Sequence, residues 1–240
     1  MRASVPDAFI TKYSPPLEGA LGFMYLDQLG LVTTSIGVLV HPLPLALGLP
    51  WIVPGEGRTA TRQEVAEDWE RVHERQDLRM RGGAVYAQVA RLRLGPGGIE
   101  LVARRKLDDM VSKLRRRFDE WDQWPADAQL AALSLAWACG PAFRYPKLAS
   151  HLKAQDWRAA ALETDIRPDH GTIRKRNEWQ RLCYENAARC YDTMGDRERL
   201  WWPEKAPAQV LREDRAGGGM LAIEGVVDGV LAARDDDATG

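Results

Sequence analysis

Residues 17–37 read LEGALGFMYLDQLGLVTTSIG, and this stretch decides which fold the chain can adopt. Glu18 is followed by Gly19, the residue type most often found just past a helix end, which predicts a helix that stops at Glu18. The runs FMYLD and LVTTSI are short, apolar and rich in β-branched or aromatic residues, and DQLG separates them, a pattern typical of a β-hairpin. A helix end that faces a hairpin would bring Glu18, Asp27 and Thr33 around one small cleft.

The three polar side chains of this stretch suit the cleavage of a glycosidic bond. Such a bond is normally cut by two carboxyl groups, one protonated to donate to the leaving oxygen and one ionised. Glu18 and Asp27 supply the carboxyls, and the hydroxyl of Thr33 would hold a water that Asp27 activates. Each residue alone also fits a structural role, as a solvated helix end, a turn residue that bonds its own backbone, or an ordinary strand residue. Their joint occurrence in this pattern favours the catalytic interpretation.

The same stretch resembles the first catalytic segment of the phage-type lysozymes, the muramidases and endolysins. The resemblance consists of the EG pair, the Y-x-D step, the glycine turn and the T-x-x-I-G ending. It places Glu18, Asp27 and Thr33 on the Glu-Asp-Thr triad of that family. The chain departs from the family just after I-G, where Val38 replaces the usual histidine or other polar residue and His41 follows three places later. A contribution of His41 to the cleft stays open beside an ordinary place in the loop.

Later segments support the resemblance less specifically, and the likeness extends from Phe9 to about Cys190. In the family, a buried helix ends in glycine, a short helix precedes a D-W or D-Y step, and a G-x-x-x-R-R-x-E helix closes the domain. Here AQLAALSLAWACG and KLASHLKAQDW match the first two features. The last feature is represented by Gly171, Arg174, Arg176 and Glu178, with Lys175 between the arginines.

Three further residues are candidates for substrate binding. Arg174 and Arg176 would contact substrate oxygens, because a guanidinium group suits bidentate contacts, although a salt bridge between helices is an equal alternative. Trp51 lies in a proline-rich apolar loop, VLVHPLPLALGLPWIVPGEGR, and is a candidate platform for stacking a sugar ring. The tryptophans on apolar helical faces are expected in the core, namely Trp69, Trp137 and Trp179.

The composition is that of an ordinary globular protein, with 240 residues, 45% of them hydrophobic and 28% charged. The net charge of −1 provides no general basic field for nucleic acid or an anionic membrane. The basic run 115–117 is interpreted as a solvated helix face in preference to a polymer-binding site. The three cysteines are odd in number and have no metal-like spacing, so neither a disulfide framework nor a metal site is expected. Cys139, in an apolar run, is expected to be buried.

Four further segments carry predictions of secondary structure. Residues 6–18 form a short helix that the Pro15 and Pro16 pair interrupts or restarts. Thr61 and Glu64 form a capping box that opens a helix. Residues 99–121 have the spacing of an amphipathic helix, whereas residues 84–94 fit a helix or a strand equally well. The segment PADAQLAALSLAWACG, at 125–140, is apolar on nearly every side and is therefore the buried central helix.

The N-terminal residues lack the charged start and apolar core of a signal peptide, and no segment is long and apolar enough to span a membrane. We therefore expect synthesis in the cytoplasm without a signal peptide, and action on the cell wall after release or delivery. Residues 1–203 are expected to form one catalytic domain. Residues 204–240 are expected to be a linker and tail with weak structure.

The resemblance implies a mainly α, α+β lysozyme-like fold, with a small N-terminal lobe that carries the hairpin, a larger helical lobe and an active-site cleft between them. It implies hydrolysis of the β-1,4 bond between N-acetylmuramic acid and N-acetylglucosamine in peptidoglycan, with Glu18 as general acid, Asp27 and Thr33 activating or positioning water, and no cofactor. A lytic transglycosylase on the same scaffold and a catalytically silent wall-binding protein are the alternatives. The delivery partner would be a holin for an endolysin, or a secretion apparatus and immunity protein for an antibacterial effector or a bacteriocin-like toxin.

Overall fold

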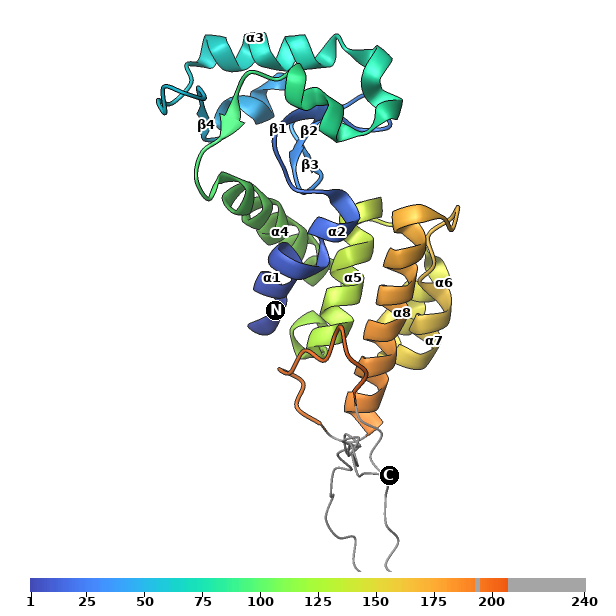
Figure 1. Cartoon of the computed structure of the whole chain (residues 1–240). Helices are drawn as coiled ribbons and strands as arrows, with labels where there is room; N and C mark the ends of the chain where they lie inside the picture. Colours follow the sequence, from blue (N-terminus) through green and yellow to red (C-terminus); the bar gives the residue numbers. More distant parts are fainter. Residues whose placement is uncertain (193–194, 207–240) are drawn as a thin grey trace, which may run out of the picture.

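The computed structural model describes residues 1–192 and 195–206, and this part of the chain is mostly helical with a small antiparallel sheet (Figure 1). The mainly helical character and the presence of a small sheet agree with the sequence prediction. The helices are α1 Ser4–Ala8, α2 Pro15–Glu18, α3 Arg62–His73, α4 Gly98–Arg117, α5 Ala126–Cys139, α6 Pro146–Ala154, α7 Trp157–Glu163 and α8 Gly171–Asp192. The strands are β1 Leu21–Leu26, β2 Val32–Ser35, β3 Val38–Leu39, β4 Trp51–Ile52 and β5 Arg93–Leu94.

The N-terminal helical segment does not run straight through its proline pair. A π-helical turn, Phe9–Tyr13, separates α1 from α2, and the amide of Ser14 donates to the carbonyl of Phe9 at 2.9 Å. Pro15 and Pro16 have no N–H to donate, so a regular α-helix would lose two hydrogen bonds there, and the wider turn takes up the break. The helix therefore restarts at Pro15, which answers the question that the sequence left open.

The predicted hairpin is confirmed, and it is the centre of a three-stranded antiparallel sheet in the order β1-β2-β3. Tyr25 on β1 lies opposite Thr33 on β2. The amide of Asp27 donates to the carbonyl of Leu31, and this hydrogen bond closes the turn between the two strands. Because side chains alternate along a strand, Tyr25, Thr33 and Asp27 are placed on the same face of the hairpin.

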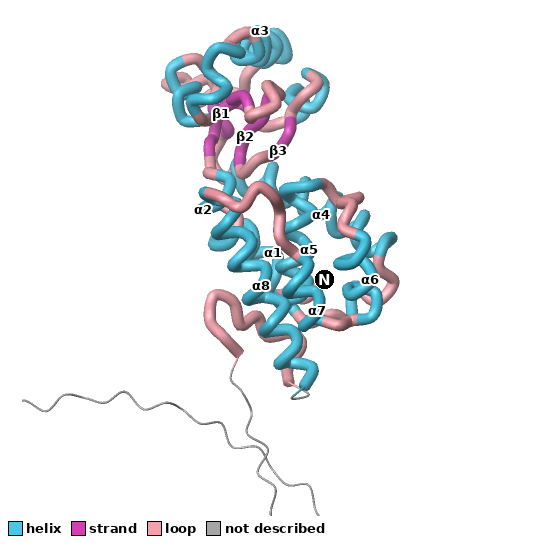
Figure 2. Tube along the Cα trace, turned by 90° about the vertical axis from the view of Figure 1, so that its right-hand side faces the viewer, coloured by secondary structure: helices cyan, strands magenta, loops and turns pink. Residues whose placement is uncertain are grey.

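Two hydrophobic clusters lie at opposite ends of the described part of the molecule, and α4 runs from one to the other (Figures 1 and 2). The smaller cluster lies between the sheet and α3, and it includes Met24, Trp51 and Val65. The larger cluster surrounds α5, which is buried on every side along most of its length, as predicted. Val38 and Ile99 pack against both clusters, so these two side chains lie at the junction.

The C-terminal end of the described chain is held against the helices by a buried carboxylate. Asp127, at the start of α5, accepts hydrogen bonds from the amides of Trp201 and Trp202 and from the side chain of Asn186. The side chain of Asn186 also bonds the backbone of Glu204 and Ala206. Contact with the domain therefore extends three residues past the predicted boundary at 203. The predicted tail from 207 to 240 lies outside the described residues.

Several local predictions need correction. The helix predicted over 99–121 ends at Arg117, because Phe118 turns extended and packs its ring against Trp124. The ambiguous segment 84–94 forms a 3-10 helix, Gly83–Gln88, and then β5. Cys139 is exposed instead of buried, because it is the last residue of α5 and lies past the packed part of the helix.

Two other expectations can be compared directly with the structure. The capping box at Thr61 and Glu64 is confirmed, with both of its hydrogen bonds present at the start of α3. Within residues 1–192 and 195–206, no helix has the length and apolar character needed to cross a lipid bilayer.

Candidate functional site

Glu18 lies at the end of α2, where the chain leaves the helix. Gly19 follows with φ of +78°, a left-handed conformation that glycine adopts at little cost, so the helix stops at Glu18 as predicted. The side chain of Glu18 is 22% exposed and forms an ion pair with Arg176 from α8. Arg176 is anchored in turn by Ser134 on α5, whose backbone and hydroxyl oxygens accept from Nη1 at 3.0 and 3.2 Å. Three helices thus meet at this carboxyl group.

The two arginines that were predicted to bind substrate, Arg174 and Arg176, are not placed to do so. Arg176 is only 3% exposed, and its guanidinium group is directed at Glu18 and Ser134, so the alternative of a salt bridge is the correct one. Arg174 lies on the exposed surface of α8 and donates weakly to the backbone of Asp169, and no described residue links it to Glu18. The prediction that they bind substrate is therefore wrong for Arg176, and nothing in the structure supports it for Arg174.

The turn after β2 lies against the Glu18 carboxyl. Gly37 has φ of +73°, and a Cβ atom added there would lie 3.0 Å from Oε2 of Glu18. A side chain at this position would therefore be strained by its backbone and would also crowd the carboxyl. The glycine allows the end of the hairpin and the end of α2 to come together.

Tyr25 connects the three residues that the sequence singled out. Burial raises the pKa of the Tyr25 phenol above its ordinary value, the charge of Glu18 raises it further, and the charge of Asp27 adds a smaller effect. A hydrogen bond from the backbone of Gly37 acts in the opposite direction. Thr33 is the cross-strand partner of Tyr25, so Tyr25 is the residue that relates all three predicted residues to one another.

The two carboxylate oxygens of Asp27 have different surroundings. Its Oδ1 accepts hydrogen bonds from the amides of Leu29 and Leu31, each at 2.9 Å, which is the backbone-bonded turn weighed in the sequence analysis. Within the described part of the chain, no donor bonds Oδ2, and the residue is partly exposed. One oxygen therefore fixes the orientation of the carboxyl, and the other is free to accept a proton or a water.

The hydroxyl of Thr33 is more enclosed. Thr33 is 4% exposed, and its Oγ1 donates to the carbonyl of Leu31 at 3.1 Å. A hydroxyl group has one donor and two acceptor positions, so Thr33 can still accept a hydrogen bond from a water. The role of Thr33 in holding water stays a prediction.

Two side chains of the site were not predicted from the sequence, Lys106 and Trp137. The ammonium group of Lys106, on α4, donates to the carbonyl of Gly37 at 2.6 Å and lies 4.1 Å from the ring centroid of Trp137. The indole N–H of Trp137, on α5, donates to the carbonyl of Ile36 at 2.9 Å. A signal for Lys106 was present, since it lies at helical spacing between Ala103 and Met110 on the buried stripe of α4.

Trp51 belongs to the core of the sheet-containing part, whereas His41 is half-buried. Trp51 is 1% exposed, and its indole N–H donates to the carbonyl of Ala46 in the 3-10 helix Leu43–Gly48, which folds over it. It has no face free for a sugar, so the prediction of a stacking platform is wrong. His41 stacks with Trp69 and His73, and so it takes the ordinary place in the loop that the sequence analysis left open.

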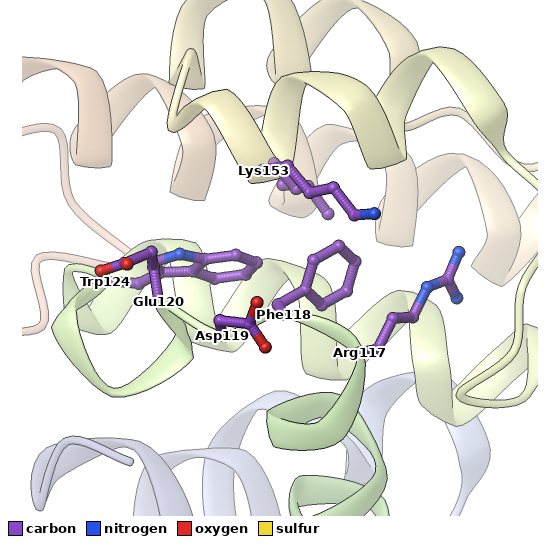
Figure 3. Close-up of a pocket in the computed structure, with 7 residues that line it drawn as sticks. Arg117, Phe118, Asp119, Glu120, Trp124 and Lys153 are labelled. Carbon is purple, nitrogen blue, oxygen red and sulfur yellow. The ribbon is translucent and has the colours of Figure 1, made fainter.

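A cavity of about 210 Å³ lies elsewhere, between the end of α4 and α6 (Figure 3). In Figure 3 the side chains of Lys153 and Arg117 reach toward the same opening, on either side of the ring of Phe118. It is lined by Arg117, Phe118, Asp119, Glu120, Trp124, Leu152 and Lys153. None of these residues belongs to the group around Glu18, so the candidate site is defined by its chemistry and not by this cavity.

Comparison of the chain with protein-family models, with curated proteins and with solved structures finds no match. The residues around Glu18, and the contacts that hold them, are therefore the features from which a function can be proposed.

Proposed function

We propose that this protein is a peptidoglycan hydrolase of the muramidase type. The observation that carries the proposal is that the charges of Glu18 and Asp27 both act on the phenol of Tyr25, whose cross-strand partner is Thr33. Glu18 comes from a helix end and the other two from a hairpin, and the turn at Gly37 brings these elements together. Two carboxyl groups are what hydrolysis of a glycosidic bond normally uses, and Glu18 and Asp27 supply them from two different elements.

In the proposed reaction, Glu18 donates a proton to the oxygen that links N-acetylmuramic acid to N-acetylglucosamine. The bond between that oxygen and the anomeric carbon breaks as a water, held by Thr33, attacks the anomeric carbon. Asp27 accepts the proton that the water loses, through the oxygen that its turn leaves unbonded. Attack from the side opposite the leaving group would invert the anomeric configuration.

Arg176 has a defined part in this mechanism. In the structure Glu18 is paired with Arg176 as a carboxylate, so in the proposed reaction Glu18 takes up a proton before it acts as the acid. Arg176 then stabilises the carboxylate that forms again when this proton is donated. Because Arg176 is fixed by Ser134 and is almost fully buried, it does not need to reorganise during the reaction. This placement supports a positioning and electrostatic function for Arg176 in place of substrate binding.

The arrangement of the two hydrophobic clusters supports a lysozyme-like fold. In the proposal, the cluster around the sheet and the cluster around α5 are the cores of the two lobes, and α4 connects them. The glycan strand would lie across the junction, where Glu18 and the Gly37 turn meet. No ordered cofactor is needed for this chemistry.

Digestion of purified peptidoglycan tests the proposal. A muramidase releases fragments with N-acetylmuramic acid at a new reducing end, which borohydride converts to muramitol. Muramitol that increases with time supports the proposal, whereas 1,6-anhydro-muramic acid ends indicate the transglycosylase alternative. A folded protein that binds peptidoglycan but releases no fragments is the silent wall-binding alternative, and it contradicts the proposal.

A further inference from the structure

We propose that Lys106 is a positioning residue for Glu18, acting through the turn at Ile36 and Gly37. This inference rests on the proposed function, because it assigns Lys106 a role in the same reaction. Its basis is geometric: one ammonium group from α4 contacts the carbonyl of Gly37 and the face of Trp137 beside the Glu18 carboxyl.

Lys106 and Trp137 together hold two consecutive carbonyl groups of the turn. Trp137 donates to the carbonyl of Ile36, and Lys106 donates to the carbonyl of Gly37. The Lys106 ammonium also rests on the Trp137 ring, so each of the two donors holds the other in place. The backbone of Gly37 is also closely packed: a Cβ atom added there would lie 3.0 Å from Oε2 of Glu18 and 3.6 Å from Nε1 of Trp137. The turn therefore cannot shift without changing the surroundings of the carboxyl.

The charges that face Lys106 come from two other helices. Burial has the largest effect and lowers the pKa of Lys106 to about 8; Glu18, on α2, acts in the opposite direction, and Arg176, on α8, lowers the pKa further. The phenol of Tyr25, on β1, shares the Gly37 turn with Lys106.

Stability alone does not account for a charged lysine in this position. The folded pKa of Lys106 is below its unfolded value, so the folded state binds fewer protons than the unfolded state above pH 8. The free energy of unfolding should therefore rise as the pH increases from about 8 to about 10. At neutral pH the charged side chain is held at a cost to stability, which is common for groups that serve a functional site.

The first test compares three variants on peptidoglycan at pH 6, where Lys106 is charged. Lys106→Met should lower kcat about 10- to 100-fold with little change in KM, because a turn displaced by less than an ångström alters the position of the general acid. Lys106→Arg should restore most of the activity, since it keeps a cationic donor. Lys113→Met is the matched control, because Lys113 lies two turns further along α4 in an exposed pair with Asp109. Full activity in Lys106→Met would overturn the proposal.

The second test does not depend on activity. The indole N–H resonance of Trp137, assigned by its loss in Trp137→Phe, should shift with a midpoint near pH 8 as Lys106 loses its charge. Lys106→Met should lack this transition, and Lys106→Arg should show none below pH 10. The same transition in all three proteins would exclude Lys106 as its source and overturn the inference. If the parent protein does not cut peptidoglycan, the proposed function fails and the catalytic role of Lys106 fails with it, whereas this titration still decides whether the Lys106 charge lies against Trp137 beside the turn.

Discussion

Glu18 and Arg176 form an ion pair that is largely shielded from water, with the carboxylate 22% exposed and the arginine almost fully buried. Such a pair is not by itself evidence of stability, because the loss of hydration offsets much of the attraction. Removal of one partner is a different matter, since it leaves the other charge in a poorly solvated place. The two residues should therefore be strongly coupled.

A double-mutant cycle measures this coupling. Glu18→Gln and Arg176→Met should each lower the free energy of unfolding, and the double variant should recover about 1–3 kcal/mol of the summed loss. The control is the cycle of Asp165→Asn and Arg181→Met, a more exposed pair, which should couple by less than about 1 kcal/mol. Equal coupling energies in the two cycles, measured by chemical denaturation, would show that the Glu18 pair is not specially placed.

At the residue scale, a site residue could be predicted only when it lay close in sequence to the other residues of the site. Glu18, Asp27 and Thr33 lie in one short stretch, so their spacing and the turn signals between them were enough to identify them as a group. Arg176 and Lys106 reach the site from 158 and 69 positions away from their partners. A single sequence contains no direct signal for such pairings, and this is why Arg176 stayed open between substrate binding and a salt bridge, and why Lys106 was not predicted.

At the scale of elements, the hairpin is the part that the sequence determined best. Its two apolar runs, its glycine turn and its strand register all act locally, and the structure has the predicted strands. The third strand and the 3-10 helix that covers Trp51 were not predicted, because the strand depends on contacts with β2 and α4 and the 3-10 helix on packing against α3. The same tertiary packing explains why Trp51 is core and not surface.

The Gly37 turn offers a test of the contact between the hairpin and α2. Gly37→Ala should lower the stability by about 1–3 kcal/mol through backbone strain, and it should also lower kcat on peptidoglycan, because the new Cβ atom crowds Glu18. Gly57→Ala is the matched control, since Gly57 has φ of +70° and no atom within 4 Å of the added Cβ. The control should lose similar stability and keep its turnover. Equal losses of turnover in both variants would remove the Gly37 contact from the mechanism.

At the scale of the whole molecule, the C-terminal end of the described chain is bound to the start of α5 through Asp127. This buried carboxylate binds the segment near Trp201 and Trp202, and Asn186 continues the connection to Ala206. The sequence placed the boundary at 203 because the composition becomes looser there, but composition does not report where the backbone hydrogen bonds end. The central helix α5, by contrast, was predicted correctly because its apolar residues cover every side.

Two truncated chains test where the domain ends. A chain of residues 1–203 loses the contacts of Asn186 with Glu204 and Ala206, which leaves a buried amide short of partners. That should cost about 1–3 kcal/mol, so its melting temperature should be about 2–12 °C below that of a chain of residues 1–206. Identical melting temperatures in a thermal scan would mean that residues 204–206 add nothing, and that the boundary at 203 was correct.

The central claim for the whole molecule is that Glu18 acts as the general acid of a peptidoglycan hydrolase, and one measurement tests it most directly. The rate at which new N-acetylmuramic acid reducing ends appear in purified peptidoglycan, measured as muramitol after borohydride reduction, is compared between the parent protein and Glu18→Gln. Glu185→Gln, at an exposed position on α8, is the control. Circular dichroism and the melting temperature establish that each variant is folded. We predict that the parent and Glu185→Gln form muramitol at equal rates, and that folded Glu18→Gln is slower by about 10²–10⁴-fold or more. A folded Glu18→Gln protein that forms muramitol at the parent rate would contradict the claim.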